Sequence, residues 1–200
     1  GERADPSTVV SFSAALGKPV VDNWWQTETG WPICGIQLEG VGAKPGSCGL
    51  PLPGWDVVVM GKDGSPMPRP VPGDKDKDKD GDKNEEARAG ALAMRLPLPP
   101  GAMQTLLGSP PPLDAQEQGQ GQKQRQGKEE GDQRFIDKYL TTFPGYFSAE
   151  DYGFSDSDGY VYVMSRTDDV INVAGHRLST GAIEEVLLAH PSVIDAAVVG

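Results

Sequence analysis

The sequence predicts a mixed α/β (α+β) protein, and three of its stretches support this prediction. Residues 6–16 read as a helix, with Pro6 near its start and Gly17 at the position of a C-cap glycine. The middle of the chain contains short β-type runs between glycine- and proline-rich turns, which is typical of a small antiparallel β subdomain. After Thr180, a second helix precedes the strand-like run 193–199, as at the start of a small α/β domain.

A polar stretch after the first helix is a candidate binding site. Val20 and Val21 are expected to enter a buried strand, and the carboxyl end of that strand leads into residues 22–30. In open α/β sheets, ligands bind beyond the carboxyl ends of the strands. The position of residues 22–30 therefore favours ligand binding.

The remaining elements follow from local patterns. The β runs are predicted at 55–60, 90–98 and 160–164, and the turns at 62–64 and 156–159. Thr180 is the predicted N-cap of the last helix, Glu184 and Glu185 lie early in it, and His190 followed by Pro191 ends it. The apolar face of this helix is formed by Ile183, Val186 and Leu187.

The composition limits the classes of partner and compartment. A net charge of −11 argues against a surface that binds nucleic acid or an anionic membrane, although much of this charge lies in or near one biased segment. Cys34 and Cys48 are far apart and are best explained as two buried thiols, which weakly favours a reducing compartment. The sequence has no signal peptide and no transmembrane run. Because it starts at Gly1 and stops just after a strand-like run, we expect it to be a fragment.

Two biased segments do not fit the α/β pattern. Residues 74–86 alternate aspartate and lysine in an insertion that reaches about residue 88, and residues 109–133 are rich in Pro, Gln, Gly and charge. Neither segment can bury enough apolar surface to offset the entropy of ordering, so both are predicted to be disordered insertions. Cation binding by the first segment is disfavoured, because it lacks calcium-loop spacing and its lysines would repel the ion.

Residues 166–177, with the sequence RTDDVINVAGHR, are the most distinctive stretch near the C-terminus. Val170, Ile171 and Val173 are typical of a strand, and Gly175 allows another group to approach the backbone closely. Two arginines flank these residues and have fork-shaped donors suited to phosphate or carboxylate. From the pattern alone, a β-hairpin with a solvated charged face is the favoured explanation of the stretch.

Two motifs resemble one enzyme family. Residues 166–177 resemble the hinge motif of the adenylate-forming acyl-CoA synthetases, and residues 22–30, DNWWQTETG, resemble the substrate and adenylate motif of the acetyl- and propionyl-CoA synthetases. The two motifs occur in the family's order, and the double tryptophan is an uncommon choice. The resemblance implies that residues 1–167 are the C-terminal part of a large AMP-binding domain. Residues 168–200 would then be the hinge and the truncated start of a small C-terminal domain.

The resemblance implies a reaction in two halves. A carboxylate attacks the α-phosphate of ATP to give an acyl-adenylate, and the thiol of coenzyme A then displaces AMP. Such a site requires donors and a cation around the phosphates, because charge moves at phosphorus in the transition state. ATP, Mg²⁺ and coenzyme A are therefore the implied cofactor and substrates.

The resemblance also assigns residues to the nucleotide and the acyl group. The implied ATP- and AMP-binding residues are Asp22, Asn23, Trp24, Trp25, Gln26, Thr27, Asp151, Arg166 and Arg177. Among them, Thr27 would donate to the α-phosphate, Asp151 would accept the ribose hydroxyls, and Trp25 would form a wall of the acyl pocket. Trp25 could equally be a core tryptophan, and the two arginines could be members of surface ion pairs.

Cation, hinge and coenzyme A roles are implied in the same way. Glu28 would hold Mg²⁺, since a hard oxygen ligand suits that ion, although it could be an ordinary surface carboxylate. Asp168 matches the hinge, and Ala174 with Gly175 matches the segment that faces coenzyme A. A second cation site matches His190 with the carbonyls of Leu188 and Val193, although a histidine before proline more often only ends a helix.

These features predict part of an AMP-forming short-chain fatty acid:CoA ligase. Residues 96–101 and 162–166 look more like the propionyl-CoA than the acetyl-CoA branch, so propionate is favoured over acetate. The family's phosphate loop would lie before Gly1 and its lysine after Gly200, so the chain alone is expected to be inactive. A non-catalytic adenylate-binding fragment and a mis-spliced gene product are the alternatives. Cytoplasm and mitochondrial matrix are both compatible with the sequence, and the oligomeric state is left open.

Overall fold

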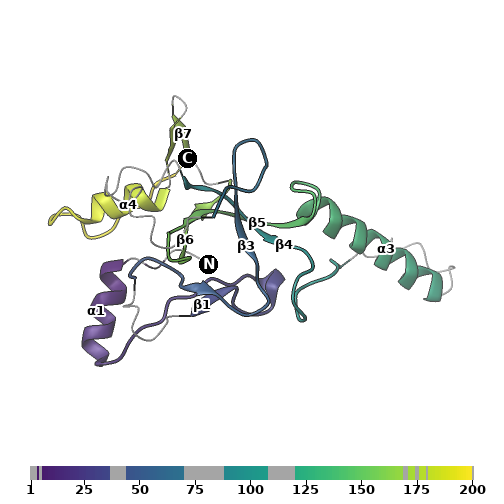
Figure 1. Ribbon diagram of the computed structural model, residues 1–200, viewed down its shortest axis with the longest axis horizontal. Coiled ribbons are helices and arrows are strands. Elements are labelled where there is room, and N and C mark those ends of the chain that lie inside the picture. Colours follow the sequence, from purple (N-terminus) through teal and green to yellow (C-terminus); the bar gives the residue numbers. More distant parts are fainter. Residues whose placement is uncertain are drawn as a thin grey trace.

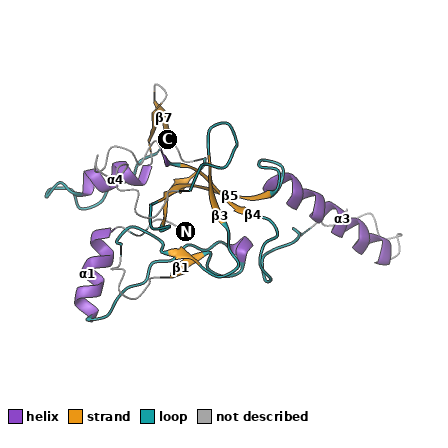
Figure 2. Ribbon diagram, viewed as in Figure 1, coloured by secondary structure: helices purple, strands orange, loops and turns teal. Residues whose placement is uncertain are grey.

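The computed structural model of the chain describes residues 4, 6–36, 44–69, 88–107, 120–168, 171–173, 176–178 and 180–199. Its centre is a four-stranded antiparallel sheet with the order β3-β4-β5-β6 (Figures 1 and 2). These strands are β3 (Val57–Met60), β4 (Gly90–Arg95), β5 (Tyr146–Ser155) and β6 (Val161–Arg166). The sheet confirms the predicted antiparallel β subdomain, and it adds β5, which the sequence analysis did not identify.

The strand β3 is apolar on both faces, and both faces are covered. Val57 and Val59 belong to the main core cluster, whereas Val58 and Met60 pack in a second cluster with Ala93. A strand buried on both faces requires a continuous apolar run instead of an alternating one. The run of valines in the sequence therefore specifies a strand covered on both faces, although β3 lies at the edge of the sheet.

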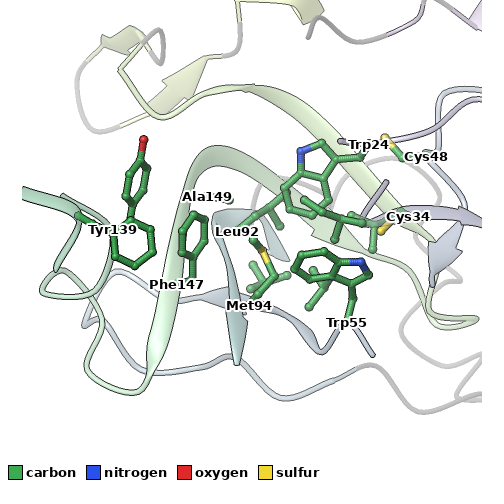
Figure 3. Close-up of a cluster of buried hydrophobic side chains, with 14 residues drawn as sticks. Trp24, Cys34, Cys48, Trp55, Leu92, Met94, Tyr139, Phe147 and Ala149 are labelled. Carbon is green, nitrogen blue, oxygen red and sulfur yellow. The ribbon is translucent and has the colours of Figure 1, made fainter. Parts of the chain in front are cut away.

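The main core lies on one face of the sheet. Figure 3 shows Trp24 and Trp55 on one side of Leu92 and Met94, and the stacked rings of Phe147 and Tyr139 on the other. Cys34 and Cys48 are buried free thiols in the same cluster, as predicted. Burial, with a smaller contribution from Cys48, raises the pKa of the Cys34 thiol. Cys34 therefore stays protonated and acts as a small apolar side chain.

The long helix α3 (Gln120–Tyr139) corrects one sequence prediction. Disorder was expected for residues 109–133, but residues 120–133 are helical, and 109–119 lie outside the described residues. The helix extends away from the sheet (Figure 1). Its C-terminal end is held by aromatic packing of Phe135 and Tyr139 on Phe147. Disorder was wrong here because composition alone cannot reveal that an apolar last turn anchors a polar helix. The other predicted insertion, 74–86, lies entirely outside the described residues.

A close backbone contact also holds α3. The Leu106 N–H donates to the carbonyl of Gly131 in the helix at 3.2 Å. A Cβ at position 131 would lie 1.9 Å from the Leu106 carbonyl oxygen, so only glycine permits this approach.

The N-terminal part partly follows the prediction. Helix α1 (Pro6–Leu16) has the predicted bounds, and Gly17 adopts φ +59 at its end. The buried strand expected at Val20 and Val21 is absent from the described residues, and Val21 is exposed. The expectation was wrong because a strand needs a hydrogen-bonded neighbour, and no described strand lies beside this segment.

The segments after α1 lead into the sheet. The 3₁₀ turn η1 (Thr27–Thr29) precedes strand β1 (Cys34–Ile36), which pairs with β2 (Leu50–Pro51) in a small antiparallel sheet. Turns at 62–64 and 156–159 form as predicted, with hydrogen bonds from Gly64 N to Gly61 O and from Gly159 N to Asp156 O.

The C-terminal part forms a hairpin and a helix. Strand β7 (Ile171–Val173) pairs with β8 (His176–Leu178), which agrees with the hairpin reading of this stretch. Helix α4 (Thr180–Leu188) ends just before His190, as predicted, and Thr180 is its first residue instead of its N-cap. The strand expected at 193–199 does not form, since Ile194 and Val199 are 97% and 90% exposed and have no described partner strand. Among the described helices, none is long and apolar enough to cross a membrane.

Candidate functional site

One cavity of about 290 Å³ brings together two distant parts of the sequence. The whole stretch from Asp22 to Glu28 lines it, and so do Asp151 on β5 and Arg166 on β6. Its lining is completed by Ala4, Cys48 and Val163. The cavity therefore joins eight of the nine residues that the sequence analysis assigned to the nucleotide, and Glu28 as well.

A compact turn fixes the polar end of this stretch. The Gln26 N–H donates to Thr29 Oγ1 at 3.0 Å, and the N–H groups of Thr29 and Gly30 donate to the Gln26 carbonyl. Gly30 has φ +72, and a Cβ there would lie 2.7 Å from the Gly101 carbonyl oxygen. The Met103 N–H donates to the Glu28 carbonyl at 2.7 Å. The turn that presents Thr27 and Glu28 is therefore supported from behind by residues 101–103.

The two adjacent tryptophans have different environments. Trp24 is 5% exposed and pairs with Cys34 in a β-bridge, whereas Trp25 is 53% exposed and lines the cavity. Successive side chains of an extended segment point to opposite sides, which separates the two rings. Trp24 is a core residue whose indole N–H also serves the site, and Trp25 is free to contact a ligand.

Asp151 is the buried charge at the centre of the site. Its Oδ2 accepts hydrogen bonds from Trp24 Nε1 at 2.8 Å and from Gln26 Nε2 at 2.7 Å. Its Oδ1 accepts one from Arg166 Nη1 at 3.3 Å, which leaves that oxygen a further lone pair. Burial raises the pKa of the Asp151 carboxyl, while the Trp24 hydrogen bond and the Arg166 charge oppose this effect. The arrangement orients one carboxylate oxygen and keeps the other able to accept from a ligand.

Arg166 lies among three carboxylates. Its Nη1 contacts Asp151 and its Nη2 donates to Glu150 Oε2 at 3.1 Å, while its Nε lies 3.8 Å from Asp168 Oδ1. Glu150 has φ +56, a conformation that non-glycine residues rarely adopt, and Lys138 Nζ lies 3.5 Å from its carboxylate. The predicted hinge residue Asp168 is 80% exposed and lies just beyond the end of β6. The guanidinium thus lies between Asp151, the predicted ribose acceptor, and the predicted hinge residue Asp168.

Glu28 has a partner that the sequence analysis did not find. The Tyr139 hydroxyl, at the end of α3, donates to Glu28 Oε1 at 2.8 Å. Burial, followed by this hydrogen bond, raises the pKa of the Tyr139 phenol, so the hydroxyl remains a donor at neutral pH. Glu28 is therefore a held carboxylate at the cavity and not a free surface side chain.

Several predicted residues are not brought into the cavity. Ala174 and Gly175 lie outside the described residues, and Arg177 is described only as a member of β8. His190 is exposed after α4, where its Nδ1 accepts the Ser192 N–H at 3.2 Å. In the described part of the chain, no group of three or more His, Cys, Asp or Glu residues is arranged to hold a metal ion. The coenzyme A and second cation sites stay predictions.

Sequence reasoning missed Tyr139, Glu150, Cys48 and Val163. Glu150 directly precedes the assigned Asp151, so the motif itself was a signal for it. Tyr139 had only a weak signal, the apolar pair Phe135 and Tyr139 after a polar run.

Comparison with known proteins agrees with this geometry. A profile of the family described as AMP-binding enzyme matches residues 1–74. An uncharacterized protein of Pseudomonas aeruginosa is 39% identical over 100% of this chain and 26% of its own length. The human mitochondrial acyl-CoA synthetase short-chain family member 3 is 37% identical over 100% of this chain and 24% of the relative. The propionate–CoA ligase of Escherichia coli is 37% identical over 100% of this chain and 26% of the relative.

Solved structures show the same fold. The O-succinylbenzoate coenzyme A synthetase of Bacillus subtilis, in complex with AMP, matches with a TM-score of 0.64 and 22% identity, over 100% of this chain and 32% of that one. An anthranilate CoA ligase in complex with anthranoyl-AMP matches with a TM-score of 0.62 and 21% identity, over 100% and 30% of the two chains.

The matches show the profile of the AMP-binding enzymes over residues 1–74 and similarity to short-chain acyl-CoA synthetases along the whole chain. The solved structures add that the fold is that of the AMP-bound coenzyme A ligases named above. The chain spans about a quarter of the length of these curated relatives, 24% and 26% in the two named enzymes.

Proposed function

We propose that this chain forms the nucleotide and acyl-binding part of an AMP-forming short-chain carboxylate–CoA ligase. The reaction would convert a short acid, ATP and coenzyme A into acyl-CoA, AMP and diphosphate through an acyl-adenylate. The single observation that supports it best is the cavity, in which residues 22–28 meet Asp151 and Arg166. The sequence motifs assign these residues to one ligand, and a common cavity is what one ligand requires.

The chain's own residues have distinct roles in this proposal. Asp151 Oδ1 accepts from the ribose hydroxyls, and Oδ2 is held by Trp24 and Gln26. Thr27 donates its hydroxyl to the α-phosphate, and Arg166 supplies positive charge beside it. Because Arg166 is already held by Asp151 and Glu150, its charge needs little reorganisation when charge develops at phosphorus.

Glu28 fits the role of a magnesium ligand. Its carboxylate lines the cavity, and Mg²⁺ in nucleotide sites is held by one or two carboxylates together with substrate phosphates. When bound there, Mg²⁺ would neutralise phosphate charge. Oε1 accepts one hydrogen bond from Tyr139, so the carboxylate keeps lone pairs for a cation.

Trp25 supports a short acyl substrate. Its indole lines the cavity and is half exposed, so it is not needed to fill the core. A rigid ring at this place can close the pocket against longer acids. Propionate is proposed over acetate from the resemblance of residues 96–101 and 162–166, and the propionate–CoA ligase of Escherichia coli is among the relatives.

AMP binding by the purified chain tests the proposal. We expect isothermal titration calorimetry to detect binding of AMP to the chain. Arg166→Met should weaken AMP binding by roughly tenfold, since a hydrogen bond to a charged group contributes about 1.5–3 kcal/mol. Arg95→Met is the matched control, because Arg95 also pairs with an aspartate, Asp56, but lies outside the cavity. No AMP binding, or equal effects of the two substitutions, would contradict the proposed site.

Turnover separates the ligase from the alternative of a non-catalytic adenylate-binding protein. The assay follows acyl-CoA formation from propionate or acetate, ATP and coenzyme A by a protein that also contains the family's phosphate loop and lysine. AMP binding without acyl-CoA formation in that protein would favour the alternative.

A further inference from the structure

The last turn of α3 contacts the candidate site through two neighbouring residues. Tyr139 donates its hydroxyl to Glu28 Oε1 at 2.8 Å, and Lys138 Nζ lies 3.5 Å from Glu150 Oε2. Successive residues of a helix point about 100° apart, so the two side chains reach separate carboxylates. One helical turn therefore touches both the Glu28 side and the Arg166 side of the cavity.

Packing fixes the position of the Tyr139 hydroxyl. The residue is 4% exposed, and its ring stacks on Phe147 with centroids 4.9 Å apart and an interplanar angle of 8°. Phe135 packs against the same ring at 5.5 Å. A tyrosine has two side-chain torsions, and packing of the ring against two other rings restricts both torsions. The hydroxyl is thus a rigid donor.

Glu28, in contrast, has a long side chain that needs a partner to stay in one orientation. Its backbone carbonyl is held by Met103, but the backbone contact does not fix the carboxylate. A glutamate loses substantial rotamer entropy when a ligand orders it. A residue that orders the carboxylate beforehand removes that cost from ligand binding.

We propose that Tyr139 is a positioning residue that holds the Glu28 carboxylate in the orientation that binds Mg²⁺ beside the nucleotide phosphates. This inference rests on the proposed function, in which Glu28 is the magnesium ligand. It also explains what α3 contributes, because the helix that begins in the polar segment ends as the support of the cation site.

The test measures how strongly Mg²⁺ strengthens ATP binding. Calorimetric titrations of the chain with ATP give one dissociation constant without Mg²⁺ and one with saturating Mg²⁺. The metal ratio is the first dissociation constant divided by the second. We expect Tyr139→Phe, which keeps the ring stack, to lower this ratio by about tenfold, the effect of one hydrogen bond to a charged group. AMP binding without metal should stay within about twofold, because Asp151 and Arg166 are untouched. A purely structural role of Tyr139 would lower thermal stability but leave the metal ratio unchanged.

Tyr162→Phe is the matched control. The Tyr162 hydroxyl also lies near a carboxylate, Asp156 Oδ2 at 3.5 Å, and neither residue lines the cavity. We expect its metal ratio to equal that of the unmodified chain.

A double-mutant cycle separates this inference from the proposed function. Glu28→Gln should make the two dissociation constants for ATP, with and without Mg²⁺, nearly equal. Tyr139→Phe should then have no further effect on the metal ratio. If Glu28→Gln leaves the ratio intact, the magnesium role of Glu28 fails. If Glu28→Gln lowers it but Tyr139→Phe does not, or if the two effects add, the positioning role of Tyr139 is overturned.

A further variant keeps the test decisive if Tyr139→Phe folds poorly. Glu28→Asp retains the carboxylate but withdraws it by one methylene from the Tyr139 hydroxyl. We expect its metal ratio to fall about tenfold as well, and a ratio equal to that of the unmodified chain would overturn the proposal.

Discussion

Replacement of Asp151 by asparagine separates ligand binding from folding at the centre of the site. An asparagine keeps one oxygen, which can still accept from Trp24 Nε1 and Gln26 Nε2. Its amide nitrogen then faces Arg166 in place of Oδ1, so the ion pair is lost. Arg166 is 40% exposed, and a pair of this kind contributes only about 0–1 kcal/mol. We therefore expect the free energy of unfolding to change by at most about 1 kcal/mol.

The effect on the ligand is expected to be larger. The ribose hydroxyls lose an anionic acceptor, and hydrogen bonds to charged groups contribute about 1.5–3 kcal/mol. AMP should consequently bind about 10- to 150-fold more weakly to Asp151→Asn. Urea unfolding gives the first quantity and calorimetric AMP titration the second. AMP binding within about twofold of the unmodified chain would refute the ribose role of Asp151.

Two further variants calibrate this result. Asp151→Ala leaves the buried Trp24 indole N–H without its partner, so unfolding should be easier by about 1–3 kcal/mol for that group alone. Asp156→Asn is the matched control. Asp156 lies on the turn between β5 and β6 and pairs with Lys44, and it does not line the cavity. It should change stability without changing AMP affinity.

The pH dependence of stability follows from the raised pKa of Asp151. Its ordinary value is 3.8, and in the folded chain the carboxyl holds its proton more tightly than in the unfolded chain. The group therefore contributes stability that is complete below the ordinary value and is lost as the pH rises through the folded value. The stability of the unmodified chain relative to Asp151→Asn should accordingly fall with rising pH above about 3.8. A relative stability that rises over this range would contradict the raised pKa.

Three other predictions concern a longer protein that contains the whole of the proposed ligase. Trp25→Gly should admit acids of about five or more carbons, with a gain of about 1–3 kcal/mol per methylene. It should cost little stability, because the ring is half exposed. An equal loss of activity with all acids in a series of straight-chain acids would assign Trp25 to the core. Asp168→Pro should impair one half-reaction far more than the other, because proline fixes φ at the predicted hinge; equal losses in adenylation and thioester formation would contradict the hinge. Deletion of 74–86 should leave activity nearly intact. Deletion of 109–133 should lower the melting temperature, since it removes the Gly131 contact of α3. A melting temperature of the 109–133 deletion equal to that of the intact protein would contradict the role of α3.

The sequence by itself predicted which residues gather at the candidate site. Residue types and their order assign the stretch 22–28 and the pair Asp151 and Arg166, and all of them line one cavity. Ligand contacts depend on particular side chains at short, fixed spacings, so a local motif records them. Elements with strong local signals were also predictable, such as α1 with its terminal Gly17 and the apolar run of β3.

Elements that depend on a distant partner were not predictable. Residues 20–21 and 193–199 have strand-like composition, but a strand forms only where a neighbour supplies hydrogen bonds. Conversely, β5 contains serine, glutamate, aspartate and glycine, yet it forms because β4 and β6 pair with it on both sides. Helix α3 likewise has a polar sequence, and its order comes from aromatic packing of its last turn on Phe147.

Only the tertiary structure decided how the site residues are held. Trp24 and Asp151 are 127 residues apart in sequence, and Tyr139 and Glu28 are 111 apart, so no local pattern relates the members of either pair. Folding of β5 against the 22–28 stretch made Trp24 a partner of Asp151 and left Trp25 facing the cavity. The physical reason is that a side chain's type fixes which bonds it can make, whereas the path of the backbone fixes which partner it meets.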